Sequence, residues 1–172
     1  MFFFLILLFT INGCSSIPKK SFPELNTVPY VDIERYLGKW YEIALYPNWF
    51  EKGCFSSTAL YEKLNDNQIK VTNQCRMYSR DGEFNEAVGR AFISDKNSNA
   101  KLKVQFFWPF KGDYWIIELD SDYQYAVVSE PGRQYLWILS RTPEMDPKVL
   151  LVLKEKIKEK GFDLNYLQFT RH

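Results

Sequence analysis

The stretch KLKVQF at residues 101–106 alternates strictly between polar and apolar side chains. Because successive side chains of a β-strand point to opposite faces, Leu102, Val104 and Phe106 share one face. The opposite face carries two lysines and a glutamine, so this strand separates water from an apolar interior. The stretch therefore predicts a half-buried strand of an antiparallel sheet.

Similar short apolar or alternating runs occur along most of the chain, and Asn, Asp, Gly and Pro separate them. The turn residues at 64–67 and 130–133 suit tight hairpins between neighbouring strands. This pattern predicts an all-β fold, an eight-stranded up-and-down antiparallel barrel. The expected strands cover residues 38–45, 55–63, 68–76, 86–93, 101–107, 113–119, 125–129 and 134–141.

A helix is predicted after the eighth strand. Asp146 and Pro147 form an N-cap and N1 pair, and Gly161 ends the segment. Strand 134–141 is apolar on both faces and needs a cover. We therefore expect a C-terminal helix that packs outside the barrel over Leu136 and Ile138, followed by a short ninth strand at residues 164–170.

The charge pattern excludes several classes of function. The 22 basic and 21 acidic residues are well mixed, which argues against a nucleic-acid surface. The single histidine, His172, lies at the end of the sequence, so no catalytic imidazole or histidine-based metal site is expected. We predict a protein that is not an enzyme and that uses no cofactor and no metal.

The N-terminus has the features of a targeting segment. Residues 1–11 form an uncharged apolar run, shorter than the roughly 20 residues that span a bilayer and typical of a signal peptide. We expect residues 1–13 to be the signal peptide and the polar, proline-containing residues 14–29 to be a tether.

The segment Ile11-Asn12-Gly13-Cys14 resembles a lipobox. The resemblance implies that the chain is cleaved before Cys14, that Cys14 is acylated, and that the protein is lipid-anchored at the cell outer membrane. Two alternatives are a plain signal peptide and a buried N-terminal segment with an incidental cysteine, since no Lys or Arg precedes the apolar run.

Two further cysteines, Cys54 and Cys75, lie on either side of the hairpin predicted at residues 64–67. They should lie almost opposite each other on paired strands. In an oxidising compartment this arrangement predicts a disulfide. The alternatives are two free thiols or a metal pair, and two thiolates with no histidine nearby make a poor zinc site.

Three motifs in order resemble the lipocalin family: LGKWYEIA at 37–44, LDSDYQYAV at 119–127 and LWILSRTP at 136–143. The third motif and FFWPF at 106–110 resemble the bacterial lipocalins most closely. The resemblance covers roughly residues 31–169 and implies a lipocalin barrel domain at residues 30–172.

The resemblance also implies roles for the motif residues. Trp40, two residues after Gly38, should close one end of the barrel, and Arg141 should lie across its indole ring. Asp122 and Tyr123 should form a turn beside the same end. All five residues are expected to be structural.

The family register and the alternation together indicate an apolar cavity for one small ligand. Small inward residues leave space, although a tightly filled core remains the alternative. Side-chain alternation along the predicted strands gives three candidates for charged groups in the cavity: Glu42, Arg90 and Glu118. The expected lining is Ala59, Tyr61, Ala87, Gly89, Leu102, Val104, Phe106, Tyr114, Ile116, Tyr135, Trp137 and Leu139.

We expect the ligand to be a fatty acid or lysophospholipid that is stored or transported in envelope maintenance. The alternatives are a structural or interaction lipoprotein with a non-functional pocket and, less favoured, a lipid-modifying enzyme. The aromatic residues Trp49 and Phe50 lie in a predicted loop, and 106–110 lie at a predicted turn. They are expected either to pack locally or to contact a membrane or a second copy in a homodimer.

Overall fold

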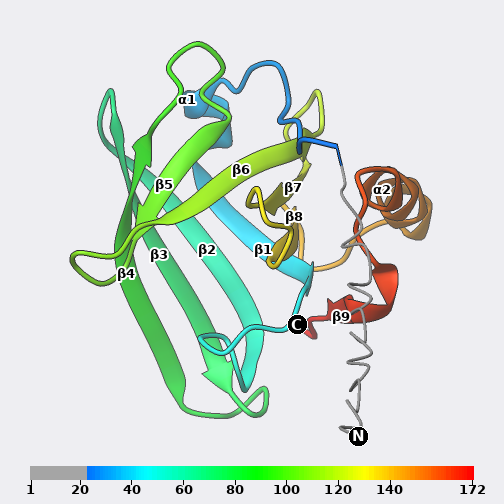
Figure 1. Ribbon diagram of the computed structural model, residues 1–172. Helices are drawn as coiled ribbons and strands as arrows, with labels where there is room; N and C mark the ends of the chain where they lie inside the picture. Colours follow the sequence, from blue (N-terminus) through cyan, green and yellow to red (C-terminus); the bar gives the residue numbers. More distant parts are fainter. Residues whose placement is uncertain (1–22) are drawn as a thin grey trace, which may run out of the picture.

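The computed structural model describes residues 23–172, and within them eight antiparallel strands form a closed barrel with one added strand (Figure 1). This architecture confirms the predicted fold class. The elements in chain order are α1 (Ile33–Tyr36), β1 (Gly38–Leu45), β2 (Cys54–Asn65), β3 (Gln68–Met77), β4 (Phe84–Ile93), β5 (Lys101–Gln105), β6 (Gly112–Leu119), β7 (Tyr125–Ser129), β8 (Leu136–Ser140), α2 (Pro147–Glu159), the 3-10 helix η1 (Leu164–Tyr166) and β9 (Gln168–Phe169).

Each strand from β2 to β8 pairs with its neighbour in the chain, and β1 closes the barrel between β8 and β2. The β1–β2 pairing is short, because residues Gly38–Tyr41 alone pair with Thr58–Tyr61. Beyond this point the two strands separate. An up-and-down barrel of this kind has two ends. The end that carries α1 is called the closed end here, and the end with the β1–β2, β3–β4, β5–β6 and β7–β8 loops is called the open end.

The C-terminal segment, residues 168–172, fills the gap between β1 and β2 at the open end. The backbone N–H of Thr170 donates to the Ile43 carbonyl at 3.0 Å, and the Ser56 N–H donates to the Arg171 carbonyl at 2.9 Å. The segment thus bonds to both strands. It completes the barrel wall where the two strands no longer pair.

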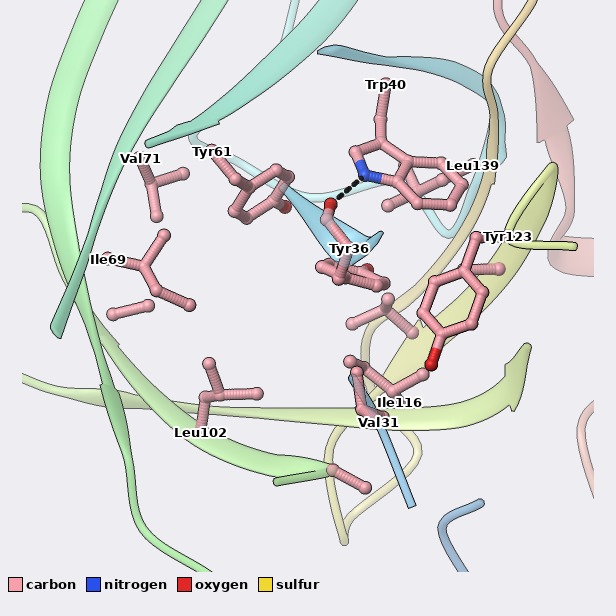
Figure 2. Close-up of a cluster of buried hydrophobic side chains, with 14 residues drawn as sticks. Val31, Tyr36, Trp40, Tyr61, Ile69, Val71, Leu102, Ile116, Tyr123 and Leu139 are labelled. Carbon is pink, nitrogen blue, oxygen red and sulfur yellow. Dashed lines mark hydrogen bonds between the residues drawn. The ribbon is translucent and has the colours of Figure 1, made fainter. Parts of the chain in front are cut away.

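Two apolar clusters hold the barrel. One lies inside, and Figure 2 shows its core around Trp40, Tyr36 and Tyr61, with Leu102 and Ile116 facing them from the opposite wall. The other lies outside, between the barrel and α2. Alternation along the strands thus divides the apolar side chains between an interior and a helix-covered face.

Helix α2 packs where the sequence predicts it. The Asp146 side chain accepts a hydrogen bond from the backbone N–H of Lys148 and caps the helix, and Pro147 is its first residue. Leu153 and Ile157 are buried against Leu136 and Ile138. The helix therefore covers the outer face of β8, a strand whose two faces are both apolar.

Several element boundaries differ from the prediction, including those of β8, β5 and the ninth strand. Strand β8 begins only at Leu136, because the Glu130 carboxylate binds the backbone N–H groups of Gln134 and Tyr135 and holds them in the turn. Strand β5 ends at Gln105, two residues earlier than expected. The predicted ninth strand is mostly the helix η1, because the Asp163 side chain caps the Asn165 N–H.

Part of the expected tether packs on the barrel. Leu25 is buried beneath α2, and the Val28 N–H donates to the Ile116 carbonyl at 3.0 Å. Arg133 Nη2 donates to the Pro23 carbonyl at 2.6 Å. The apolar side chain of Leu25 and these bonds fix residues 23–29, so they do not form a free tether.

The predicted signal peptide and Cys14 lie outside the described residues. Among residues 23–172, no helix is both long enough and apolar enough to cross a bilayer.

Candidate ligand-binding site

A residue pair near the closed end forms its plug. The guanidinium carbon of Arg141 lies 3.8 Å from the centroid of the Trp40 ring. Arg141 also donates to the carbonyls of Arg35 and Lys39 at 2.7 and 2.9 Å. Gly38 adopts a φ of +92°, and a Cβ there would lie 3.4 Å from Arg141 Nη1. These contacts support the structural roles predicted for Gly38, Trp40 and Arg141.

The predicted turn beside this end is also in place. The Tyr123 hydroxyl accepts a hydrogen bond at 2.8 Å from the backbone N–H of Asp32, and the Tyr123 ring belongs to the interior cluster. Asp122 lies exposed in the same turn, where its N–H donates to the Asp120 carboxylate. This turn is therefore tied to the segment that precedes α1.

Three tyrosine hydroxyls meet inside the barrel above the Trp40 plug. The Tyr114 hydroxyl lies 2.8 Å from those of Tyr36 and Tyr61. Burial raises the pKa of all three phenols, so they are neutral at ordinary pH. They form the polar floor of the half of the barrel that faces the open end.

The inner wall can be read from the register of β3 and β4. Val71 pairs with Gly89 and Asn73 with Ala87, and Val71 belongs to the interior cluster. Ala87, two residues from Gly89, therefore faces inward too, yet it is exposed. Water thus reaches the inner wall near the open end.

Gly89 does not leave the free space that its small size predicts. A Cβ on Gly89 would lie 2.8 Å from the Phe106 ring and 2.7 Å from the Gln105 carbonyl. The Phe106 ring covers this glycine from inside the barrel. Gly89 therefore allows close packing of β4 against the end of β5.

The other predicted lining residues gather on the inner face. Four are buried members of the interior cluster, five pack against it half-buried, and Tyr135 stacks on Trp137 with ring centroids 5.9 Å apart. The four buried residues are Tyr61, Leu102, Ile116 and Leu139. The five half-buried residues are Ala59, Val104, Phe106, Tyr114 and Trp137.

Two of the three candidate cavity charges lie outside the barrel. The Glu118 carboxylate forms ion pairs with Lys156 and Lys160 of α2, at 2.9 and 3.1 Å. A β-bulge between Ile116 and Glu118 shifts the alternation and turns Glu118 outward. Arg90 is exposed between two inward residues, so it too faces outward.

The third candidate, Glu42, is buried on the inner face beside a second acid that the sequence analysis missed. That acid is Glu51 of the β1–β2 loop, which accepts hydrogen bonds from Trp137 Nε1 at 3.0 Å and from the Asn48 side chain. Thr170 donates its hydroxyl to Glu42. The two glutamates therefore join β1, the β1–β2 loop, β8 and the C-terminal segment.

Burial and mutual repulsion change the protonation of this pair. Burial first, and then the nearby Glu51 charge, raise the pKa of Glu42 from 4.5 to about 8. Burial also raises the pKa of Glu51, although the bonds from Asn48 and Trp137 oppose the rise. The pair therefore retains a proton at neutral pH.

A pocket of about 420 Å³ opens beside these acids, between the β1–β2 loop and the C-terminal segment. Its volume is within the range of roughly 300–1,000 Å³ typical of small-molecule sites. Glu42, Glu51, Lys52 and Arg171 line it, so it is polar and carries both signs of charge.

The Cys54–Cys75 disulfide is formed, with the Cα atoms 5.4 Å apart, which confirms the prediction. It ties the start of β2 to β3 beside the pocket. Among residues 23–172, no group of three or more His, Cys, Asp or Glu side chains is arranged to hold a metal ion.

A barrel with one plugged end, one loop-lined open end and an outer helix defines the class of calyx proteins, whose interiors take small ligands. The family model of the lipocalin-like domain matches residues 31–172. The chain belongs to the lipocalin family.

Relatives at high identity support this assignment. The chain is 42% identical to the outer membrane lipoprotein Blc of Vibrio cholerae, over 94% of this chain and 92% of the relative. It is 40% identical to the temperature-induced lipocalin-1 of Arabidopsis thaliana, over 86% and 82%. Identity to the Blc lipoprotein of Escherichia coli K12 is 38%, over 91% and 87%.

Solved structures show the same fold at lower identity. Insecticyanin from the tobacco hornworm Manduca sexta superposes with a TM-score of 0.69 at 19% identity, covering 88% of this chain and 86% of its own. Apocrustacyanin C2 gives 0.67 at 17% identity, covering 82% and 79%.

Proposed function

We propose that this protein is an outer-membrane lipoprotein that binds a fatty acid or a lysophospholipid in its barrel and stores or transports it in envelope maintenance. The acyl chain would lie against the apolar inner wall, and the polar head would lie at the open end. The observation that carries this proposal is an apolar inner wall that water reaches from one end.

The wall is suited to an acyl chain because it is apolar at depth and accessible near the mouth. Leu102, Ile116 and Leu139 are buried inside, whereas Ala59 is partly accessible and Ala87 exposed. Lipocalins are generally binding proteins rather than enzymes, which agrees with this interpretation.

The place of the anchor supports a membrane-facing open end. Pro23 is held by Arg133 in the β7–β8 loop, which belongs to that end. Cys14 precedes Pro23 by nine positions, so an extended chain would span at most about 30 Å. An acylated Cys14 would thus hold the open end near the lipid surface.

Exposed aromatic side chains occupy loops of the same end. Trp49 belongs to the β1–β2 loop, and Phe107, Trp108 and Phe110 belong to the β5–β6 loop. Trp108 is 87% exposed, and an aromatic of this kind is well suited to a membrane interface. We expect these residues to contact headgroups and to guide a lipid into the barrel.

Two neighbouring residues on β4 allow a matched test of binding. Ala87→Trp places a large ring inside the barrel mouth, whereas Val88→Trp places the same ring on the outer face. In displacement of a fluorescent fatty acid by lysophospholipid, Ala87→Trp should weaken binding by about tenfold or more. Val88→Trp should leave it unchanged. If the folded wild-type protein binds neither the fluorescent fatty acid nor lysophospholipid, the proposal fails.

Anchoring has a separate test. Cys14→Ser should move the protein from the outer-membrane fraction to the soluble fraction and remove the mass of the acyl chains. A membrane-bound Cys14→Ser protein would contradict acylation at this residue.

A further inference from the structure

The buried acids at the open end discriminate between the two proposed ligand classes. We propose that Glu42 and Glu51 bind the ammonium group of a zwitterionic lysophospholipid headgroup, of which lysophosphatidylethanolamine is the simplest example. This inference rests on the proposed function and deepens it. It predicts selection against anionic amphiphiles, including fatty acids.

The two carboxyl groups have no cationic partner among the described residues. Glu42 is only 6% exposed, and none of the ion pairs formed within residues 23–172 includes Glu42 or Glu51. Two adjacent carboxylates in such a place are costly unless they keep a proton or gain a cation. Burial raises the pKa of both, which is what a carboxyl pair without a counter-ion would show.

A buried hydroxyl lies at the same place. Ser57 is 7% exposed, and its Oγ has no hydrogen-bond partner of good geometry among the described residues. It lies beside the Glu42 carboxyl, and its weak interaction with that group opposes the rise in the pKa of Glu42. A primary ammonium group has three donors. The oxygens of the two carboxyl groups and of this hydroxyl can accept hydrogen bonds from such donors.

Aromatic rings border the acids on the barrel side. Trp137, which donates to Glu51, stacks on Tyr135 at an interplanar angle of 13°. The Phe50 ring lies 5.7 Å from Tyr135 and 6.4 Å from Trp137. Faces of aromatic rings attract ammonium groups and do not attract carboxylates. This surrounding therefore favours a cation over an anion.

The lining of the 420 Å³ pocket also includes cationic side chains that suit a phosphate. Lys52 and Arg171 line the pocket, and His172 lies nearby, with its Nε2 2.7 Å from the Glu42 carbonyl oxygen. A phosphoethanolamine headgroup carries an ammonium and a phosphate a few bonds apart. A pocket lined by both acids and bases can hold both charges of such a headgroup.

The test compares three amphiphiles with the same acyl chain: lysophosphatidylethanolamine, lysophosphatidylglycerol and the free fatty acid. Titration calorimetry near neutral pH should show that the first binds about tenfold more tightly than the other two. Calorimetry in buffers of different ionisation enthalpy should also show proton release with the first ligand alone, because the ammonium displaces the proton that the acids share.

Glutamine variants locate the effect. Glu51→Gln and the double variant Glu42→Gln/Glu51→Gln should lose both the preference and the proton release, while Glu86→Gln, on the outer face of β4, should keep them. Equal affinities without proton release in the wild-type protein would overturn the inference and leave the proposed function standing. Absence of binding by all three ligands would overturn both.

Discussion

The guanidinium group of Arg141 covers the Trp40 ring and reaches the carbonyls of Arg35 and Lys39. It joins the segment after β8 to helix α1 and to the start of β1. The closed end of the barrel is therefore held by one side chain that combines a cation–π contact with several hydrogen bonds.

Replacing this arginine should show how much the plug contributes. Arg141→Lys keeps the charge but loses the planar guanidinium group, whose several N–H donors reach several carbonyls at once. We expect the free energy of unfolding to fall by about 1–3 kcal/mol, measured by urea denaturation. Arg90→Lys, exposed on the outer face of β4, is the control and should change it by less than about 0.5 kcal/mol.

The disulfide should account for a large share of the stability. It closes a loop with a sequence separation of 21, which corresponds to about 3 kcal/mol on the loop-entropy model. Cys54→Ser/Cys75→Ser should lower the free energy of unfolding by that amount. The wild-type protein under reducing conditions should match the double variant. An unchanged denaturation midpoint would argue against this contribution.

Helix α2 provides a matched pair of leucines. Leu153 is buried against the barrel, and Leu151 is 62% exposed on the same helix. Leu153→Ala should cost about 2–5 kcal/mol of folding free energy, because it leaves a cavity beneath the helix. Leu151→Ala should be nearly neutral. Similar losses for both would mean that the helix does not pack as described.

The acid pair predicts a pH dependence of stability. The folded protein holds the Glu42 proton with a pKa of about 8, whereas the ordinary value is 4.5. The stabilisation is therefore complete below a pH of about 4.5 and is lost as the pH rises towards about 8. The slope approaches about 1.4 kcal/mol per pH unit for one proton. Urea denaturation across this range should show a steeper fall for wild type than for Glu42→Gln.

The fold could be predicted because its signals are local. The alternation at residues 101–106 and the turn residues between strands specify strands and hairpins without knowledge of distant contacts. Asp146, Pro147 and the apolar stripe likewise specify α2. The position of Arg141 over Trp40 came from the family motifs, because no local pattern relates residues so far apart.

The site was predicted only in part. The alternation of side chains along the strands placed Glu42 inside correctly. It also placed Glu118 inside, because a bulge in β6 leaves no clear mark in the sequence. Glu51 was missed because it lies in a loop, where periodicity gives no information. The one available signal was a carboxylate directly after the aromatic pair Trp49-Phe50.

The C-terminal segment between β1 and β2 has a consequence for the order of folding. The hairpins from β2 to β8 join neighbours in the chain and can form early. Closure requires Glu42 to meet Thr170 and His172, 128 and 130 residues away, so it carries a larger loop-closure entropy than any hairpin of the barrel. We expect the contacts of the C-terminal segment with β1 and β2 to form last. Until then the apolar inner wall stays exposed, which makes the unclosed barrel prone to aggregation.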